Sequence, residues 1–260
     1  MMISVEKYDG VIEITLANPK VNAIGVAMSR ELGRVFGDFM ANDSEHVAIV
    51  SGGAGNVFSA GWDMKAAVAA GEGEASDFGP GGFAGLTELF ALTKPVIAAV
   101  NGAAVGGGVE LMLACDLIVA AQTATFRLPE TSLGVLADAG GVQRLPRRLP
   151  YHIAMELLLT GRAMPADEAA RYGLVNWVVP KDRVLSEARR VALELAARAP
   201  LAVRAVKETV RATLHLSEED AFARLKRRDL ATYRRMLESS DRQEGPRAFV
   251  EKRKPQWQGR

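Results

Sequence analysis

Short apolar runs alternate with glycine-rich loops and helical stripes along the first two thirds of the chain. Residues 11–16 alternate between apolar and polar side chains, whereas residues 47–50, 95–100 and 117–120 are continuously apolar. The first pattern predicts a half-buried strand, and the continuous runs predict fully buried strands. Apolar residues recur at helical spacing over residues 27–40, which predicts a helix there. The repeated order of strand, glycine loop and helix is typical of an α/β fold.

The pattern changes near residue 195, where strand signals end and amphipathic helices follow one another. We therefore place a boundary there, between a core of residues 1–195 and a helical region of residues 196–260. Helices without a sheet to cover must bury their apolar stripes in each other or in a partner subunit. The helices expected in this part of the chain span residues 183–199, 201–214, 217–239 and 245–254.

Composition excludes several classes of protein. The 260 residues are 48% hydrophobic and 24% charged, with a net charge of +1, so nothing favours nucleic acid or a membrane surface as partner. The single cysteine, Cys115, rules out an internal disulfide framework. The first ten residues carry charges where a signal peptide needs an apolar core, and no apolar run reaches the length of a membrane span. We expect a cytoplasmic protein.

Residues 94–116 carry the first candidate chemistry. The apolar run 95–100 is followed by three glycines, 106–108, and then by an apolar helix with Glu110 in its first turn. Consecutive glycines let the backbone approach a ligand closely, and a helix N-terminus presents free N–H groups. A carboxylate in an apolar helix is costly to bury unless it is used or compensated. This stretch therefore predicts an oxyanion site with an acid–base residue beside it.

Two further acids, Glu130 and Asp138, lie in or beside glycine and proline turns. Either could cap a helix or a loop, whereas two carboxylates in one apolar pocket would have separated pKa values, as an acid and a base require. The sequence alone leaves these readings open. The three histidines are scattered, so no metal cluster is expected, and no phosphate-binding or GxSxG motif is present.

Two motifs resemble those of the enoyl-CoA hydratase/isomerase (crotonase) superfamily. Residues 58–65, FSAGWDMK, are similar to F-S-A-G-x-D, and residues 101–111, NGAAVGGGVEL, are similar to N-G-x-A-x-G-G-G-x-E-L. Residues 129–130, 140–145 and 248–254 match as well, so the resemblance covers almost the whole chain. It implies a spiral of ββα units with a C-terminal helical region that forms a homotrimer or a dimer of trimers.

The resemblance also implies a chemistry. Family members bind an acyl-CoA thioester and stabilise its enolate, without a permanently bound cofactor. The backbone N–H groups of Ala60 and Gly107 would form the oxyanion hole, Glu110 would activate water, and Glu130 would deliver the proton to Cα. The residues that would contact coenzyme A or the acyl group are Lys20, Val21, Ala60, Gly61, Trp62, Asp63, Met64, Gly106 and Lys252.

A narrower resemblance points to the acyl group. Residues 58–67, 77–88 and 244–260 are similar to a branch of the family that interconverts crotonobetainyl-CoA and carnitinyl-CoA. A trimethylammonium group is recognised by aromatic faces and negative charge. The candidates for this head group are Trp62, Phe78, Phe83, Asp77 and Asp138, although the two phenylalanines could equally anchor a long loop to the core.

Asp138 leaves alternatives open. Many hydratases of the family have a glycine at this position, whereas dienoyl-CoA isomerases carry an aspartate, so isomerisation by Glu130 and Asp138 is the second hypothesis. A general short-chain enoyl-CoA hydratase is another. A non-catalytic member that binds acyl-CoA or RNA is disfavoured, because both glutamates are present and the charge is near neutral.

Overall fold

The chain is built around two β-sheets, and the computed structural model describes residues 2–53, 55–71 and 76–260. The larger sheet has six strands in the order β1-β2-β3-β5-β7-β10 and is parallel except for the β1–β2 hairpin. Its strands are β1 Ile3–Tyr8, β2 Val11–Leu16, β3 Val47–Gly52, β5 Val96–Val100, β7 Leu117–Ala121 and β10 Trp177–Val179. Strands β3 and β5 are buried throughout, as their continuous apolar runs predict.

The smaller sheet positions the loops that matter for function. It has the order β4-β6-β8-β9, with β4, β6 and β8 parallel and β9 antiparallel. Its strands are β4 Val57–Ser59, β6 Ala103–Val105, β8 Thr125–Arg127 and β9 Met164–Pro165. Strands β3, β5 and β7 of the large sheet are each followed by one strand of the small sheet, so the chain winds through both sheets in ββ units. This is the α/β fold expected from the sequence, although β1 and the four short strands were not.

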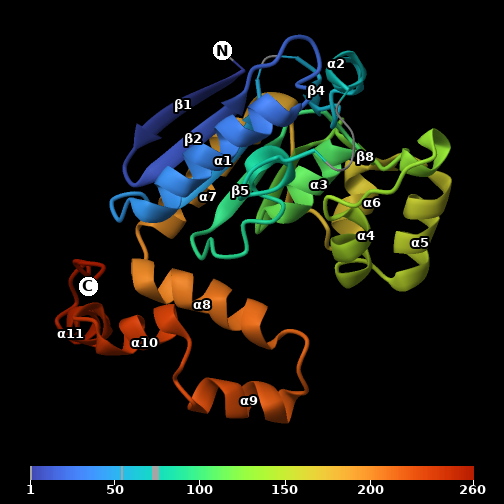
Figure 1. The fold of residues 1–260 in the computed structure, drawn as a ribbon. Coiled ribbons are helices and arrows are strands. Elements are labelled where there is room, and N and C mark those ends of the chain that lie inside the picture. Colours follow the sequence, from blue (N-terminus) through green and yellow to red (C-terminus); the bar gives the residue numbers. More distant parts are fainter. Residues whose placement is uncertain (1, 54, 72–75) are drawn as a thin grey trace.

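Helices cover the sheets and extend the molecule at one end (Figure 1). Helix α1 buries its predicted apolar stripe, and α7 packs across β3, β5 and β7. The helices of the core are α1 Val26–Ala41, α2 Met64–Ala70, α3 Gly107–Ala114, α4 Gly141–Arg144, α5 Tyr151–Thr160, α6 Ala166–Arg171 and α7 Val184–Ala196. Those of the C-terminal region are α8 Pro200–Thr213, α9 Glu218–Lys226, α10 Ala231–Glu238 and α11 Asp241–Val250. No helix in the described ranges is long and apolar enough to cross a membrane.

The prediction of a single helix over residues 217–239 is wrong, because this segment forms two helices, α9 and α10. Arg228 between them has a positive φ of 54°, which a helix interior does not allow. A contact with another helix causes the break. Glu208 of α8 accepts the backbone N–H groups of Thr232 and Tyr233 at 3.0 and 2.9 Å, and so caps a new helix N-terminus.

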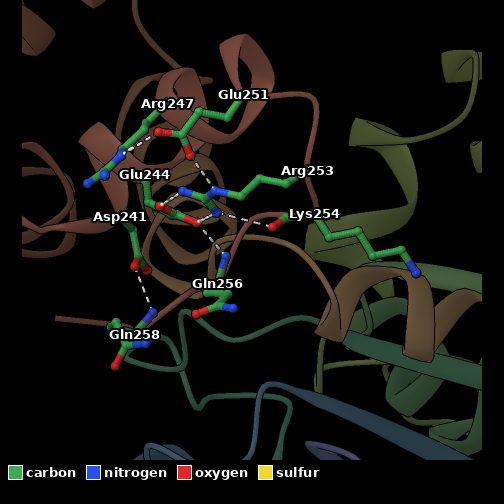
Figure 2. A network of polar contacts seen from close by, with 8 residues as sticks. All are labelled: Asp241, Glu244, Arg247, Glu251, Arg253, Lys254, Gln256 and Gln258. Carbon is green, nitrogen blue, oxygen red and sulfur yellow. Dashed lines mark hydrogen bonds and ion pairs between the residues drawn. The ribbon is translucent and has the colours of Figure 1, made fainter.

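The chain end folds back on α11 through a network of charged groups (Figure 2). Arg253 forms a two-point ion pair with Glu244, at 2.5 and 2.9 Å, and also contacts Glu251 at 2.6 Å. The carboxylate of Asp241 accepts the backbone N–H groups of Gln258 and Gly259. These bonds fix the C-terminal turn within its own chain, at the end of the molecule opposite α2 in Figure 1.

The contact between α1 and the 3₁₀ turn Phe83–Gly85 gives a stability test. Gly85 has φ of 64°, and a Cβ there would lie 2.1 Å from the backbone nitrogen of Gly33. Gly85→Ala should therefore lower the free energy of unfolding by about 3 kcal/mol or more. Gly37 lies inside α1 with nothing within 4 Å of an added Cβ, so Gly37→Ala should raise it by about 1 kcal/mol. Urea unfolding of both variants checks this; a stable Gly85→Ala protein would contradict the described packing.

Candidate active site

The pocket of interest forms where three neighbouring parallel strands end. Strands β4, β6 and β8 lie side by side, and the chain leaving each one carries Trp62, Gly107 and Glu130 respectively. Ligands in α/β proteins bind at such carboxyl ends of parallel strands. The pocket has a volume of about 300 Å³. It is lined by Ala60, Trp62, Met64, Phe78, Phe83, Val105, Gly106, Gly107, Glu110, Pro129, Glu130, Leu133, Val135, Leu136, Asp138 and Ala139.

Two backbone segments approach each other at the floor of this pocket. Gly61 has φ of 80°, and a Cβ there would lie 2.6 Å from the nitrogen of Gly107. Gly107 opens α3, where the first N–H groups of a helix have no partner within the helix. Within the described ranges, neither the N–H of Gly107 nor that of Trp62 has an acceptor. Two free donors therefore come from adjacent turns.

The expectation that Ala60 supplies one of these donors needs correction. Its N–H donates to the carbonyl oxygen of Val21 at 2.9 Å, and is therefore occupied. Trp62, two residues further on, lines the pocket, and the hydrogen bonds on both sides of it leave its own N–H free. The N–H of Trp62 stays free because the chain here pairs with Ile24 through the groups on either side of it. These are the carbonyl of Gly61 and the N–H of Asp63. The pair of donors is thus Trp62 and Gly107.

Glu110 is buried in the first turn of α3, with 4% of its surface exposed. One carboxylate oxygen, Oε1, accepts the backbone N–H of Gly141 at 2.9 Å. Burial raises the pKa of Glu110 to about 7; the charges of Glu130 and Asp138 also raise it, while the Gly141 hydrogen bond and the Arg144 charge lower it. A carboxyl group with a pKa near neutrality can exchange a proton with a substrate at physiological pH.

Glu130 faces the same pocket from the following unit. It begins a 3₁₀ turn directly after Pro129, and its Oε1 lies against Gly106, where a Cβ would be only 2.9 Å away. Its other oxygen, Oε2, is buried with no hydrogen-bond partner among the described residues. Burial raises the pKa of this carboxyl group as well. An unpartnered buried oxygen on a pocket wall is available to a bound molecule.

The remaining walls are mostly aromatic and aliphatic. Phe83 is buried and its ring lies against Gly107, while Phe78 meets it edge to face with ring centroids 5.7 Å apart. The phenylalanines therefore both anchor their loop and line the pocket. Trp62 is half-buried, and its indole N–H has no acceptor among the described residues. Asp77 does not reach the site, because it pairs with Arg30 at 2.9 Å on the surface.

The residues expected to contact coenzyme A are only partly brought together. Met64 and Gly106 line the pocket with Ala60 and Trp62, but five others do not. The side chain of Asp63 caps α2 by accepting the N–H of Ala66 at 3.0 Å. Lys252 lies in the turn after α11 and does not line the pocket of its own chain. The other residues outside the pocket lining are Lys20, Val21 and Gly61.

Sequence reasoning missed several residues of the site. Gly141 supplies the hydrogen bond to Glu110, and the exposed side chains of Leu133, Val135 and Leu136 form an apolar rim. The glycine pair 140–141, where α4 begins, was the available signal for Gly141, whereas the apolar rim lies on a loop without periodicity. In the described part of the chain, no group of three or more His, Cys, Asp or Glu side chains is placed to hold a metal ion.

A pocket with two free backbone donors and two facing glutamates is that of an enzyme acting on an activated carbonyl compound. The chain belongs to the enoyl-CoA hydratase/isomerase family, whose model matches residues 6–260. It is 52% identical to a carnitinyl-CoA dehydratase of Citrobacter koseri over 254 residues, which covers 98% of this chain and 97% of that protein. It is also 52% identical to a carnitinyl-CoA dehydratase of Proteus mirabilis over 250 residues, 96% of this chain and 95% of that one.

Solved structures agree with this assignment. An enoyl-CoA hydratase from Mycobacterium tuberculosis superimposes with a TM-score of 0.90 at 40% identity, covering 100% of this chain and 99% of that chain. A carnitinyl-CoA hydratase from Mycobacterium avium superimposes with a TM-score of 0.77 at 37% identity, with the same coverage. The fold expected from the sequence is confirmed.

The raised pKa of Glu110 can be tested without any assay of activity. Because the acid form persists up to a pH of about 7, an infrared carboxyl C=O band should be present at pH 5.5 and lost as the pH rises through about 7. The same band should be absent from the Glu110→Gln variant, which assigns it. A band that has vanished by pH 5, as for an exposed glutamate, would show that the carboxyl group is not held in an apolar site.

Proposed function

We propose that the protein catalyses the reversible addition of water to an α,β-unsaturated acyl-CoA thioester, with crotonobetainyl-CoA and carnitinyl-CoA as the substrate pair. The observation that carries the proposal is the convergence of two acids and two free donors: Glu110 and Glu130 face one pocket with the N–H groups of Trp62 and Gly107. The names of the relatives support the substrate, since the carnitinyl-CoA dehydratases match over nearly the full length.

The two N–H groups would bind the thioester oxygen. Addition of water to the double bond places negative charge on that oxygen as the enolate forms. Donors held at about 2.7–3.1 Å stabilise this charge without reorganisation, and removal of one such donor typically costs about 10²–10³-fold in rate. In this pocket the donors belong to rigid turns, because Gly61 and Gly107 are packed against each other.

The glutamates would move the protons. In hydration, Glu110 accepts a proton from water as the oxygen bonds to Cβ, and Glu130 gives its proton to Cα, so the atoms of one water are added. Dehydration is the reverse: Glu130 takes the α-proton, and Glu110 protonates the departing hydroxyl group. Each direction requires one proton on the pair.

Both glutamates hold a proton more firmly than an exposed carboxyl group does. Burial, with a smaller effect of the charges of Glu130 and Asp138, raises the pKa of Glu110 to about 7, and burial raises the pKa of Glu130 as well. Two interacting carboxyl groups titrate as a pair. A pair that holds one proton is the state that either direction of the reaction requires.

The acyl head group would meet aromatic faces and a carboxylate. A trimethylammonium group cannot donate hydrogen bonds, and it is stabilised by aromatic rings and negative charge. Trp62, Phe78 and Phe83 lie on the pocket wall together with the exposed carboxylate of Asp138. We propose Trp62 and Asp138 as the residues that contact this group, because Phe83 is buried against the core.

The C-terminal residues 196–260 would form the oligomerisation region of a homotrimer or a dimer of trimers. Helix α8 exposes Val206 and Val210 in one row with Leu214 just after its end, and α9 exposes Phe222, with fractions of 49–73%. Exposed apolar faces of this kind mark surfaces that another subunit covers. The same assembly would bring Lys252 to a neighbouring pocket, where it would contact coenzyme A. A cytoplasmic location and the absence of a permanent cofactor remain predictions.

Isomerisation of a dienoyl thioester is the second candidate. The observation in its favour is that Asp138 lines the pocket with Glu130, so two acids besides Glu110 could carry a proton between carbon atoms. Product analysis distinguishes the two reactions, since isomerisation leaves the mass of the thioester unchanged.

Single glutamine variants test the roles of the glutamates. Glu110→Gln and Glu130→Gln should each lower kcat for hydration of crotonobetainyl-CoA by about 10²–10⁴-fold, because a general acid or base is lost. Glu88→Gln is the matched control, since Glu88 is exposed near Phe83 and does not line the pocket. Loss of the conjugated thioester absorbance measures the rate. Full activity in either pocket variant would refute the assigned roles.

The choice of acyl group can be tested with two substrates. Asp138→Asn should lower kcat/KM for crotonobetainyl-CoA about 10-fold and for crotonyl-CoA much less, because only the first substrate carries a cation. Comparing the two ratios removes any effect on the glutamates, which act on both substrates. Equal losses would exclude Asp138 from head-group recognition. A wild-type preference for crotonyl-CoA would instead favour a general short-chain hydratase.

A further inference from the structure

Arg144, at the end of α4, has an unusual environment for an arginine. Its side chain is half-buried and forms no ion pair with a carboxylate among the described residues. It donates instead to two backbone carbonyl groups, those of Thr87 and, at 3.4 Å, of Ala139. The guanidinium lies directly against Gly140, where a Cβ would be 1.9 Å from its Nη1. The glycine is therefore needed to make room for the arginine.

These bonds join two walls of the pocket. Thr87 is buried, and its hydroxyl donates to the carbonyl of Phe83 at 2.9 Å, so it belongs to the wall that carries the aromatic rings. Ala139 belongs to the opposite loop, two residues before Gly141, whose N–H holds Glu110. Arg144 bridges the loops that deliver these two contacts, although it does not itself line the pocket.

Arg144 also completes the charges around Glu110. The groups that act on this carboxyl are Glu130 and Asp138, which are acidic, the N–H of Gly141, and Arg144, which is the one cation among them. Burial lowers the pKa of Arg144, the charges of Arg148 and of Arg211 in α8 lower it further, and the charge of Glu110 raises it. A half-buried cation beside two other arginines is costly to keep, which argues that its position serves the site.

We propose that Arg144 is a positioning residue for the reaction: it locks the loop of residues 137–141 against the Thr87 segment, so that Gly141 N–H engages Glu110, and it supplies the positive charge that faces this glutamate. The kinetic part of this inference rests on the proposed hydratase activity, whereas the geometric and electrostatic part does not.

Three variants separate positioning from simple packing. Arg144→Gln removes the charge and most of the donors, whereas Arg144→Lys keeps the charge but cannot reproduce the two-pronged contact. Arg147→Gln is the matched control. Arg147 lies three residues after Arg144 and is exposed, and among the described residues it bonds only to the carbonyl of Gln143. The first readout is the infrared titration of the Glu110 carboxyl band, which requires no activity. The second is the pH profile of kcat/KM.

The expected sign follows from the charges. Loss of the cation destabilises the ionised form of Glu110, so the carboxyl band of Arg144→Gln should persist to higher pH than in the wild type. The alkaline limb of kcat/KM, where the pair loses its last proton, should move upward with it. In Arg144→Lys both should stay near their wild-type positions, while kcat falls on the order of 10–100-fold through misplacement of the loop. Arg147→Gln should change neither.

A folded Arg144→Gln protein whose carboxyl band titrates at the wild-type pH overturns the proposal, as does full kcat in Arg144→Lys. If Arg144→Gln does not fold, Arg144→Lys still tests the proposal. If Arg144 had a purely structural role, the kcat of Arg144→Lys would be close to that of Arg147→Gln when both are assayed at a temperature low enough to keep them folded. A wild-type protein without hydratase activity would refute the proposed function, and the band titration would still test the position of Arg144.

Discussion

The close approach of Gly61 and Gly107 is the constraint on which the site depends. A Cβ on Gly61 would come within 2.6 Å of the Gly107 nitrogen, and one on Gly107 within 2.5 Å of the Phe83 ring. Only glycines allow two βα turns and an aromatic ring to meet at one point. That contact brings the free N–H of Trp62 and the first N–H of α3 to the same pocket, and no other residue type at these two positions would leave it intact.

The buried acid follows from the same geometry. Because α3 begins at Gly107, Glu110 lies one turn into a helix whose residues are all buried, and only 4% of its surface is exposed, at the pocket. A single N–H from Gly141 does not replace the lost hydration, so the pKa of the group stays near 7. Burial of this carboxyl group lowers the stability of the fold, but it yields an acid that can exchange its proton near neutral pH. Such perturbed pKa values are common at active sites.

The two sheets have different roles. The large sheet supplies most of the hydrophobic core through its largely buried strands β2, β3, β5 and β7, and α7 packs across it. The small sheet is made of strands of two or three residues, and it contributes little core. Its role is to align successive turns, so that Trp62, Gly107 and Glu130 emerge from neighbouring strands β4, β6 and β8. Repetition of one ββ unit therefore builds a site from segments about 45 and 23 residues apart in the sequence.

The sequence by itself determined the α/β class, the buried strands β3, β5 and β7, and helix α1. It also predicted an acid–base role for Glu110. These features are local: apolar periodicity and a carboxylate in an apolar run are visible without knowledge of the partners. The family motifs added Glu130 and Gly107, because their residue types stand at recognisable spacings. The short strands of the small sheet escaped notice, since two or three residues are too few for any periodicity to show.

Only the tertiary structure decided which backbone donor is free and which residues meet. The motif alone does not show whether Ala60 or Trp62 has the free N–H. The N–H of Ala60 is occupied by the carbonyl of Val21, which lies some forty residues earlier. The break between α9 and α10 likewise depends on Glu208 in another helix. Asp77 and Asp138 looked alike as candidate charges until Arg30 engaged the first on the surface. In each case, the deciding atom belongs to a residue distant in sequence, and pattern along the chain carries no information about it.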